Sequence, residues 1–81
     1  MRIDKFLKIS RIIKRRNVAQ DACDGGRIEV NGRDAKPSKD VKAGDIVIVH
    51  FGNDTVKIKI LATPDVANKA NATDLYEVID D

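Results

Sequence analysis

Hydrophobic residues near the N-terminus recur with the period of an α-helix. Ile3, Phe6 and Leu7 are spaced i, i+3 and i+4, which predicts a short helix with one buried stripe. Basic residues occur at every third position on a different face of this helix, at Arg2, Lys5 and Lys8. Asp4 lies in the first turn, where the helix dipole favours an anion. We expect Asp4 to pair with Arg2 or Lys8 and to organise them, rather than to act as a catalytic acid.

A second helix is predicted after a basic connection, from which Ile12 and Ile13 return to the core. We expect Asn17 to cap this helix, because its side-chain oxygen can accept from the free backbone N–H groups. Its expected buried face consists of Val18, Ala19, Ala22 and Cys23. Gly25 and Gly26 end the helix, since glycine adopts the left-handed conformation at no steric cost. Arg16 would then precede a helix N-terminus, where backbone donors help to bind a phosphate.

From Arg27 the hydrophobic period changes to two, which indicates β-structure. The segment 27–30 alternates polar and apolar residues, and Asn31-Gly32 is a strong hairpin signal. The returning strand around 33–36 meets Pro37, so it must be short or lie on a sheet edge. A turn at 41–45 then precedes a strand at 46–51. A second turn at 52–54 precedes a strand at 56–60, an irregular segment at 63–73 and a closing strand at 75–79.

These elements predict an α+β fold in which two N-terminal helices pack on a small, mainly antiparallel sheet of about five strands. With 81 residues we expect a single domain, 1–81. The chain is 42% hydrophobic and 35% charged, which is typical of a folded, soluble domain. No apolar run approaches the ~20 residues of a membrane helix, and the N-terminus does not resemble a secretion signal. One cysteine excludes an internal disulfide and fits the reducing cytoplasm.

Charge is distributed unevenly along the chain. Residues 1–16 carry seven bases and one acid, a net +6, whereas 17–45 carry −1 and 46–81 carry −3, which together give the overall +2. Crowding like charges costs self-repulsion, and a polyanion is the partner that best relieves it. The charge pattern therefore favours RNA binding. The candidate RNA-binding residues are Arg2, Asp4, Lys5, Lys8, Arg11, Lys14, Arg15, Arg16 and Arg27.

Arg2 and Arg16 are the first candidates for RNA contact, because a guanidinium can hold two phosphate oxygens at once. We expect both to lie on one side of the molecule, directed outward and not engaged by the protein's own carboxylates. The remaining N-terminal cations would attract phosphates diffusely, each being individually replaceable. A solvated basic helix face is the plain alternative. For Arg27, an RNA contact and a solvated surface position are equally supported. Lys36, Lys39 and Lys42 are better explained as solvated loop residues.

Several other functions find no support in the sequence. Aromatic residues make up 4% of the chain, and all three occupy apolar core or strand positions, so a platform for stacking unpaired bases is not expected. Folded RNA, recognised by its shape and phosphates, is the better expectation. His50 has no second ligand at metal-binding spacing, and Cys23 fits a small core residue. With no catalytic constellation, we expect neither an enzyme nor a metal or cofactor.

Several of these motifs together resemble the S4 RNA-binding domain family. They are Arg2-Ile3-Asp4-Lys5-Phe6-Leu7, Arg16 with Ala19, Gly26-Arg27-Ile28, Val30-Asn31-Gly32, Pro37 and Val41-Lys42-Ala43-Gly44-Asp45. The resemblance covers residues 1–49, and it implies that 50–81 supply the strands that complete the sheet. It also aligns Arg16 with the arginine by which this family usually contacts RNA, and leaves Arg15 as an additional cation.

The short, free-standing form is most similar to the S4 proteins of ribosome-associated quality control in Firmicutes, and is related to the heat-shock S4 protein that associates with ribosomes. The resemblance implies a cytoplasmic, ribosome-associated monomer that binds 23S rRNA and peptidyl-tRNA on obstructed large subunits. It also implies cooperation with the RqcH tailing factor while alanine tails are added, without a membrane or DNA partner. Alternatives are an S4 module that binds another structured RNA, a module of an RNA-modifying enzyme and, more weakly, a DNA-binding helix pair.

Overall fold

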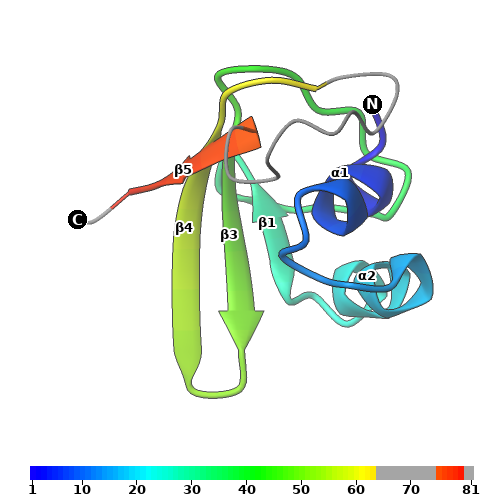
Figure 1. Ribbon diagram of the computed structural model, residues 1–81. Helices are drawn as coiled ribbons and strands as arrows, with labels where there is room; N and C mark the ends of the chain where they lie inside the picture. The colour runs from blue at the N-terminus through cyan, green and yellow to red at the C-terminus, as the bar shows by residue number, and fades with distance from the viewer. Residues whose placement is uncertain (64–74, 80–81) are drawn as a thin grey trace.

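The helices and strands form two layers, with both helices on the same face of the sheet (Figure 1). The structure is a computed structural model and describes residues 1–63 and 75–79. Its elements are α1 (Ile3–Ile9), α2 (Arg16–Asp24), β1 (Ile28–Val30), β2 (Arg33–Asp34), β3 (Ile46–Phe51), β4 (Asp54–Ile60) and β5 (Tyr76–Val78). This confirms the predicted α+β fold. The segment predicted to be irregular, 63–73, lies outside the described residues from position 64 onward.

Helix α1 buries the predicted stripe and is held at its start by a distant part of the chain. Ile3, Phe6 and Leu7 are fully buried. No side chain caps the helix, which follows the extended residue Arg2. Instead the N–H of Ile3 donates to the carbonyl oxygen of Lys39 at 2.8 Å. The first amides of a helix lack acceptors within it, so this neighbouring segment supplies one.

Helix α2 begins earlier than the sequence predicts. Arg15 is its N-cap residue and Arg16 its first helical residue, with no side-chain cap. The expectations that Asn17 caps the helix and that Arg16 precedes it are therefore wrong. Arg16 and Gln20 lie one turn apart on α2 and both hydrogen-bond to Asp4 of α1. These tertiary contacts anchor the first turn and outweigh asparagine's local preference for the N-cap position.

The two glycines after α2 end it as predicted. Gly25 is the C-cap residue, and Gly26 has the left-handed φ of +74°. The N–H of Gly26 donates to Cys23 and that of Arg27 donates to Ala22, at 3.1 and 2.9 Å. This pair of bonds satisfies two carbonyl oxygens of the last turn and turns the chain into β1.

Val18 does not belong to the buried face of α2, although the sequence placed it there. Its exposed fraction is 45%, whereas Ala19, Ala22 and Cys23 are buried. Each helical residue is rotated by about 100° from the one before, so Val18 falls at the margin of a face centred on Ala19, Ala22 and Cys23. With Ile12 and Phe51, it borders a shallow hollow instead.

The sheet has the strand order β2-β1-β3-β4-β5, and every neighbouring pair is antiparallel. Asn31 and Gly32 join β1 to β2 with φ values of +53° and +84°. Positive φ at both positions defines the tight turn that the sequence predicted. The two-residue strand β2 occupies one edge, as expected from Pro37.

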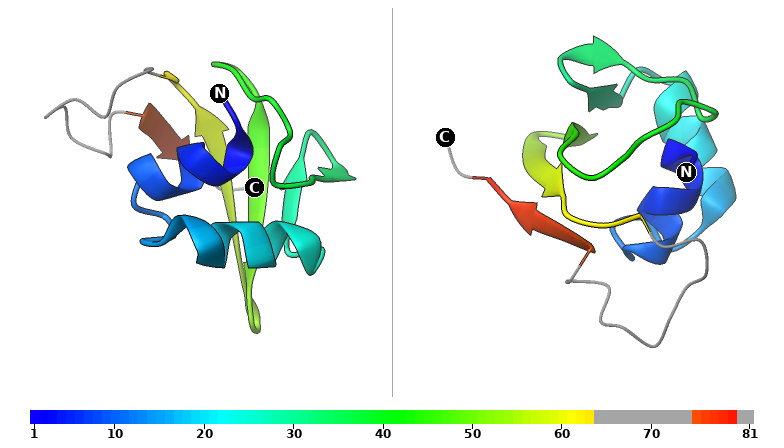
Figure 2. Two further views of the ribbon diagram at one scale, coloured as in Figure 1. Left: turned by 90° about the vertical axis from the view of Figure 1, so that its right-hand side faces the viewer. Right: turned by 90° about the horizontal axis from the view of Figure 1, so that it is seen from above.

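The side of the sheet that faces the helices is apolar. Ile28, Val30, Val47, Val49 and Ile58 are buried there, and the register pairs Ile28 with Val49 and Val47 with Ile58. Seen after a quarter turn, the two helices lie in front of the strands and cover this side (Figure 2). Neither of the helices in the described ranges is long and apolar enough to cross a membrane.

Candidate nucleic-acid interface

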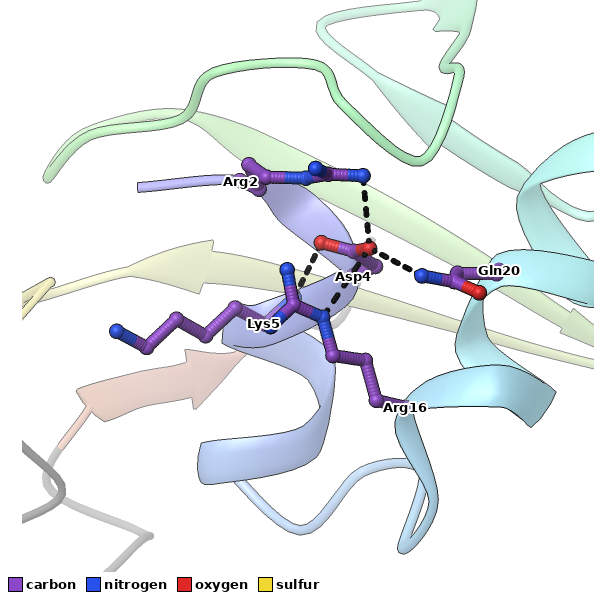
Figure 3. Close-up of polar contacts among 5 residues, drawn as sticks. All are labelled: Arg2, Asp4, Lys5, Arg16 and Gln20. Carbon is purple, nitrogen blue, oxygen red and sulfur yellow. Dashed lines mark hydrogen bonds and ion pairs between the residues drawn. The ribbon is translucent and has the colours of Figure 1, made fainter.

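Asp4 is the centre of a polar cluster between the starts of the two helices (Figure 3). Its exposed fraction is 0%, although it is a carboxylate. Its atom Oδ2 accepts hydrogen bonds from Gln20 Nε2 at 3.0 Å, Arg2 Nη2 at 3.2 Å and Arg16 Nε at 3.3 Å. Its atom Oδ1 accepts from the backbone N–H of Lys5 at 2.7 Å. We call Arg2, Asp4, Arg16 and Gln20 the Asp4 cluster.

The cluster keeps Asp4 ionised. Burial by itself raises the pKa of this carboxyl group, but the hydrogen bonds from Gln20 and the Lys5 N–H, together with Arg16, lower it below its usual value of 3.8. At neutral pH the carboxylate therefore carries its charge. Two guanidinium groups and one carboxylate leave the cluster with a net charge of +1.

Arg2 and Arg16 lie on the same side of the molecule, as predicted, because both contact one oxygen of Asp4. Their side chains are 49% and 42% exposed. The expectation that they are free of the protein's own carboxylates is wrong, since each donates one N–H to Asp4. A guanidinium has five N–H donors, so four remain on each for a ligand. Asp4 thus fixes the positions of the two groups without saturating them.

Asp4 does organise Arg2, as the sequence suggested, but its other partners come from α2 and not from Lys8. The missed residue is Gln20, which donates to Asp4 from a position 16 residues further along the chain. The spacing i, i+4 of Arg16 and Gln20 places both on one face of α2 and was the available signal. Nothing local indicates that this face meets the start of α1.

The other predicted residues fall into separate places. Lys8, Arg11 and Lys14 line one hollow on the connection between α1 and α2. Lys5 gives its backbone N–H to Asp4 while its side chain extends away from the cluster (Figure 3). Arg15 is exposed at the start of α2. Arg27 follows the opposite end of α2 and borders the hollow beside Val18, so the structure does not join it to Arg2 and Arg16.

The structure assigns His50 and Cys23 structural roles. Nε2 of His50 lies 2.6 Å from Oε2 of Glu29 on the neighbouring strand, and its Nδ1 lies 3.3 Å from the hydroxyl oxygen of Thr55. Cys23 is buried in the core, and burial raises the pKa of its thiol to about 11. Within residues 1–63 and 75–79, no group of three or more His, Cys, Asp or Glu side chains is placed to hold a metal ion.

Comparisons with known proteins show which family the chain belongs to. The S4 domain model matches residues 1–47. The "RQC P-site tRNA stabilizing factor" of Streptococcus pneumoniae is 51% identical over 98% of this chain and 90% of its own length, and that of Bacillus subtilis is 46% identical over 98% and 92%. The trimeric structure of Vibrio cholerae heat shock protein 15 superposes with a TM-score of 0.88 and 35% identity, over 98% of this chain and 81% of that one. The chain therefore belongs to the S4 domain family.

Proposed function

We propose that this protein is a non-enzymatic RNA-binding factor of ribosome-associated quality control. In this role it binds 23S rRNA and the peptidyl-tRNA of obstructed large ribosomal subunits, as a monomer in the cytoplasm. It steadies the tRNA while the RqcH factor adds alanine tails to the stalled chain. Residues 1–49 form the RNA-binding part of a single domain, and 50–81 complete its sheet.

The observation that carries this proposal is the pair of half-exposed guanidinium groups fixed by Asp4. A side chain that is already ordered loses little conformational entropy when it binds, so its remaining donors are ready for phosphate oxygens. The surrounding cations, Lys5, Lys8, Arg11, Lys14, Arg15 and, at a distance, Arg27, add attraction for a polyanion. The relatives support the choice of RNA, because their name refers to a P-site tRNA.

Sedimentation in a sucrose gradient tests the ribosomal part of the proposal. In a lysate of cells that express the protein, we expect it in the large-subunit fraction, enriched where subunits carry obstructed nascent chains. The gradient is run at low and at moderate salt, because phosphate contacts weaken as salt rises. Recovery only at the top of both gradients would refute the ribosomal assignment.

Two substitutions test the proposed face. Arg16→Ala removes a guanidinium from the Asp4 cluster, whereas Lys39→Ala removes an exposed loop cation and serves as the control. We expect Arg16→Ala to lose more affinity for folded 23S rRNA, measured at a temperature where both variants are fully folded. Equal losses would show that the Asp4 cluster is not the binding face.

Salt dependence measures how many cations meet phosphates. If about five do so, log affinity of the unmodified protein should fall with log salt at a slope on the order of −4. A slope near zero, with folded 23S rRNA as the probe, would contradict binding through phosphates.

A further inference from the structure

A second cationic feature lies on the connection between α1 and α2. Lys8, Arg11 and Lys14 line a hollow of about 370 Å³ there. All three side chains are exposed, and no carboxylate of the described residues forms an ion pair with any of them. The Asp4 cluster differs in this respect, because there an internal carboxylate compensates the cations. Within residues 1–63 and 75–79, the hollow therefore keeps together three positive charges that no carboxylate pairs with.

Arg11 has a backbone conformation that an arginine rarely adopts. Its φ is +62°, in the left-handed region. It follows Ser10, the C-cap of α1, and its N–H donates to the carbonyl oxygen of Lys8 at 3.0 Å. Gly26 holds the equivalent position after α2, with φ of +74° and a bond of 3.1 Å to Cys23. The chain thus places glycine in one of two matching turns and a sterically strained arginine in the other.

Helix capping does not account for these cations. Basic side chains near a helix C-terminus often bond to its last carbonyl oxygens. In α1 three of these oxygens already have other donors. Phe6 O accepts from the Ser10 N–H, Leu7 O accepts from the Ser10 hydroxyl and the Ile13 N–H, and Lys8 O accepts from the Arg11 N–H. The side chains of Lys8, Arg11 and Lys14 are therefore not required to complete the helix.

We propose that Lys8, Arg11 and Lys14 form a separate subsite for one phosphodiester group of the RNA backbone. This inference rests on the proposed function and adds a second point of contact to the Asp4 cluster. The left-handed backbone fixes the direction of the Cα–Cβ bond of Arg11, from which the guanidinium extends. Its planar fork takes two phosphate oxygens, while the two ammonium groups supply charge. Strained residues of this kind cluster at functional sites. Arg11 is accordingly not a replaceable cation, which revises the expectation from the sequence.

Arg11→Gly removes the side chain of this residue but permits the same backbone conformation, so the two contributions can be measured separately. Glycine adopts the φ of +62° without strain, so the variant should unfold at the same temperature as the unmodified protein or at a higher one. It should nevertheless bind folded, protein-free 23S rRNA about ten-fold more weakly, and its salt slope should be less steep by about one unit. Arg11→Lys, which keeps the charge but lacks the fork, should recover part of the affinity.

Arg33→Ala is the matched control. It also removes an exposed arginine, from β2, on the side of the molecule away from the connection between the helices (Figure 2).

Equal affinities of the Arg11→Gly and Arg33→Ala variants would overturn the subsite and leave the proposed function standing. A lower unfolding temperature for Arg11→Gly would overturn the argument from strain. If Arg11→Gly loses affinity for large subunits that carry no tRNA but not for protein-free rRNA, the partner is a ribosomal protein and the phosphodiester subsite is overturned. Failure of the unmodified protein to bind either probe would refute the proposed function itself.

Discussion

Replacing Asp4 by asparagine tests whether its buried charge holds the two helices together. The change keeps the shape of the side chain but removes the charge and one acceptor. The amide nitrogen must face either the Lys5 N–H on one side or the three donors from Arg2, Arg16 and Gln20 on the other. In the better orientation only the bond to the Lys5 N–H is lost, while the other three lose their charge assistance.

The expected cost follows from these contacts. A lost bond to a partly buried backbone donor costs about 1 kcal/mol, and weaker bonds to partly exposed guanidinium groups add about as much again. We therefore expect the free energy of unfolding to fall by about 2 kcal/mol. For a domain of this size that lowers the melting temperature by roughly 8–16 °C, which circular dichroism at neutral pH measures directly.

The stability difference between the unmodified protein and Asp4→Asn should also depend on pH. The folded-state pKa of Asp4 is lowered below 3.8, so its contribution to stability is complete above that pH and is lost as the pH falls through the folded-state value. The difference between the unmodified protein and Asp4→Asn should therefore shrink in strong acid. Asp40→Asn makes the same chemical change at a side chain that is 87% exposed, and should have a much smaller effect at neutral pH. Equal melting temperatures for the unmodified protein and Asp4→Asn at neutral pH, or a difference that persists unchanged at pH ~2, would refute the reasoning.

Three further experiments test the fold. Gly26→Ala places a Cβ on a residue with φ of +74° and should cost about 1 kcal/mol in urea unfolding, and an unchanged midpoint would argue against the left-handed turn. The buried Cys23 thiol, with its pKa raised to about 11, should react with a disulfide reagent at pH ~8 far more slowly in the folded protein than in urea, and similar rates would mean that it is accessible. Ile28→Ala should cost about 3 kcal/mol because the residue is fully buried between sheet and helices, whereas a cost below about 1 kcal/mol would contradict that packing.

Elements that depend on neighbours in the chain were predictable from the sequence. The stripe of Ile3, Phe6 and Leu7, the turn at Asn31-Gly32 and the alternation along 27–30 each report a local period or a local backbone preference. Within residues 1–63 and 75–79 they lead to the correct number, order and type of elements. The expected cap at Asn17 failed because tertiary contacts of Arg16 and Gln20 override a local preference. The expected burial of Val18 failed because this residue lies at the margin of the buried face of α2.

By itself, the sequence determined that this chain folds as two helices on an antiparallel sheet and carries its positive charge at one end. Only the tertiary structure decided how those charges are used. It brings Arg16 and Gln20 of α2 to the buried Asp4 of α1. It also places Arg11, in a left-handed turn, beside Lys8 and Lys14, where no carboxylate of the described part of the chain forms an ion pair with them. The physical reason is that a hydrophobic period reports which face of each element is buried, whereas the pairing of charges depends on how separate elements are brought together in space.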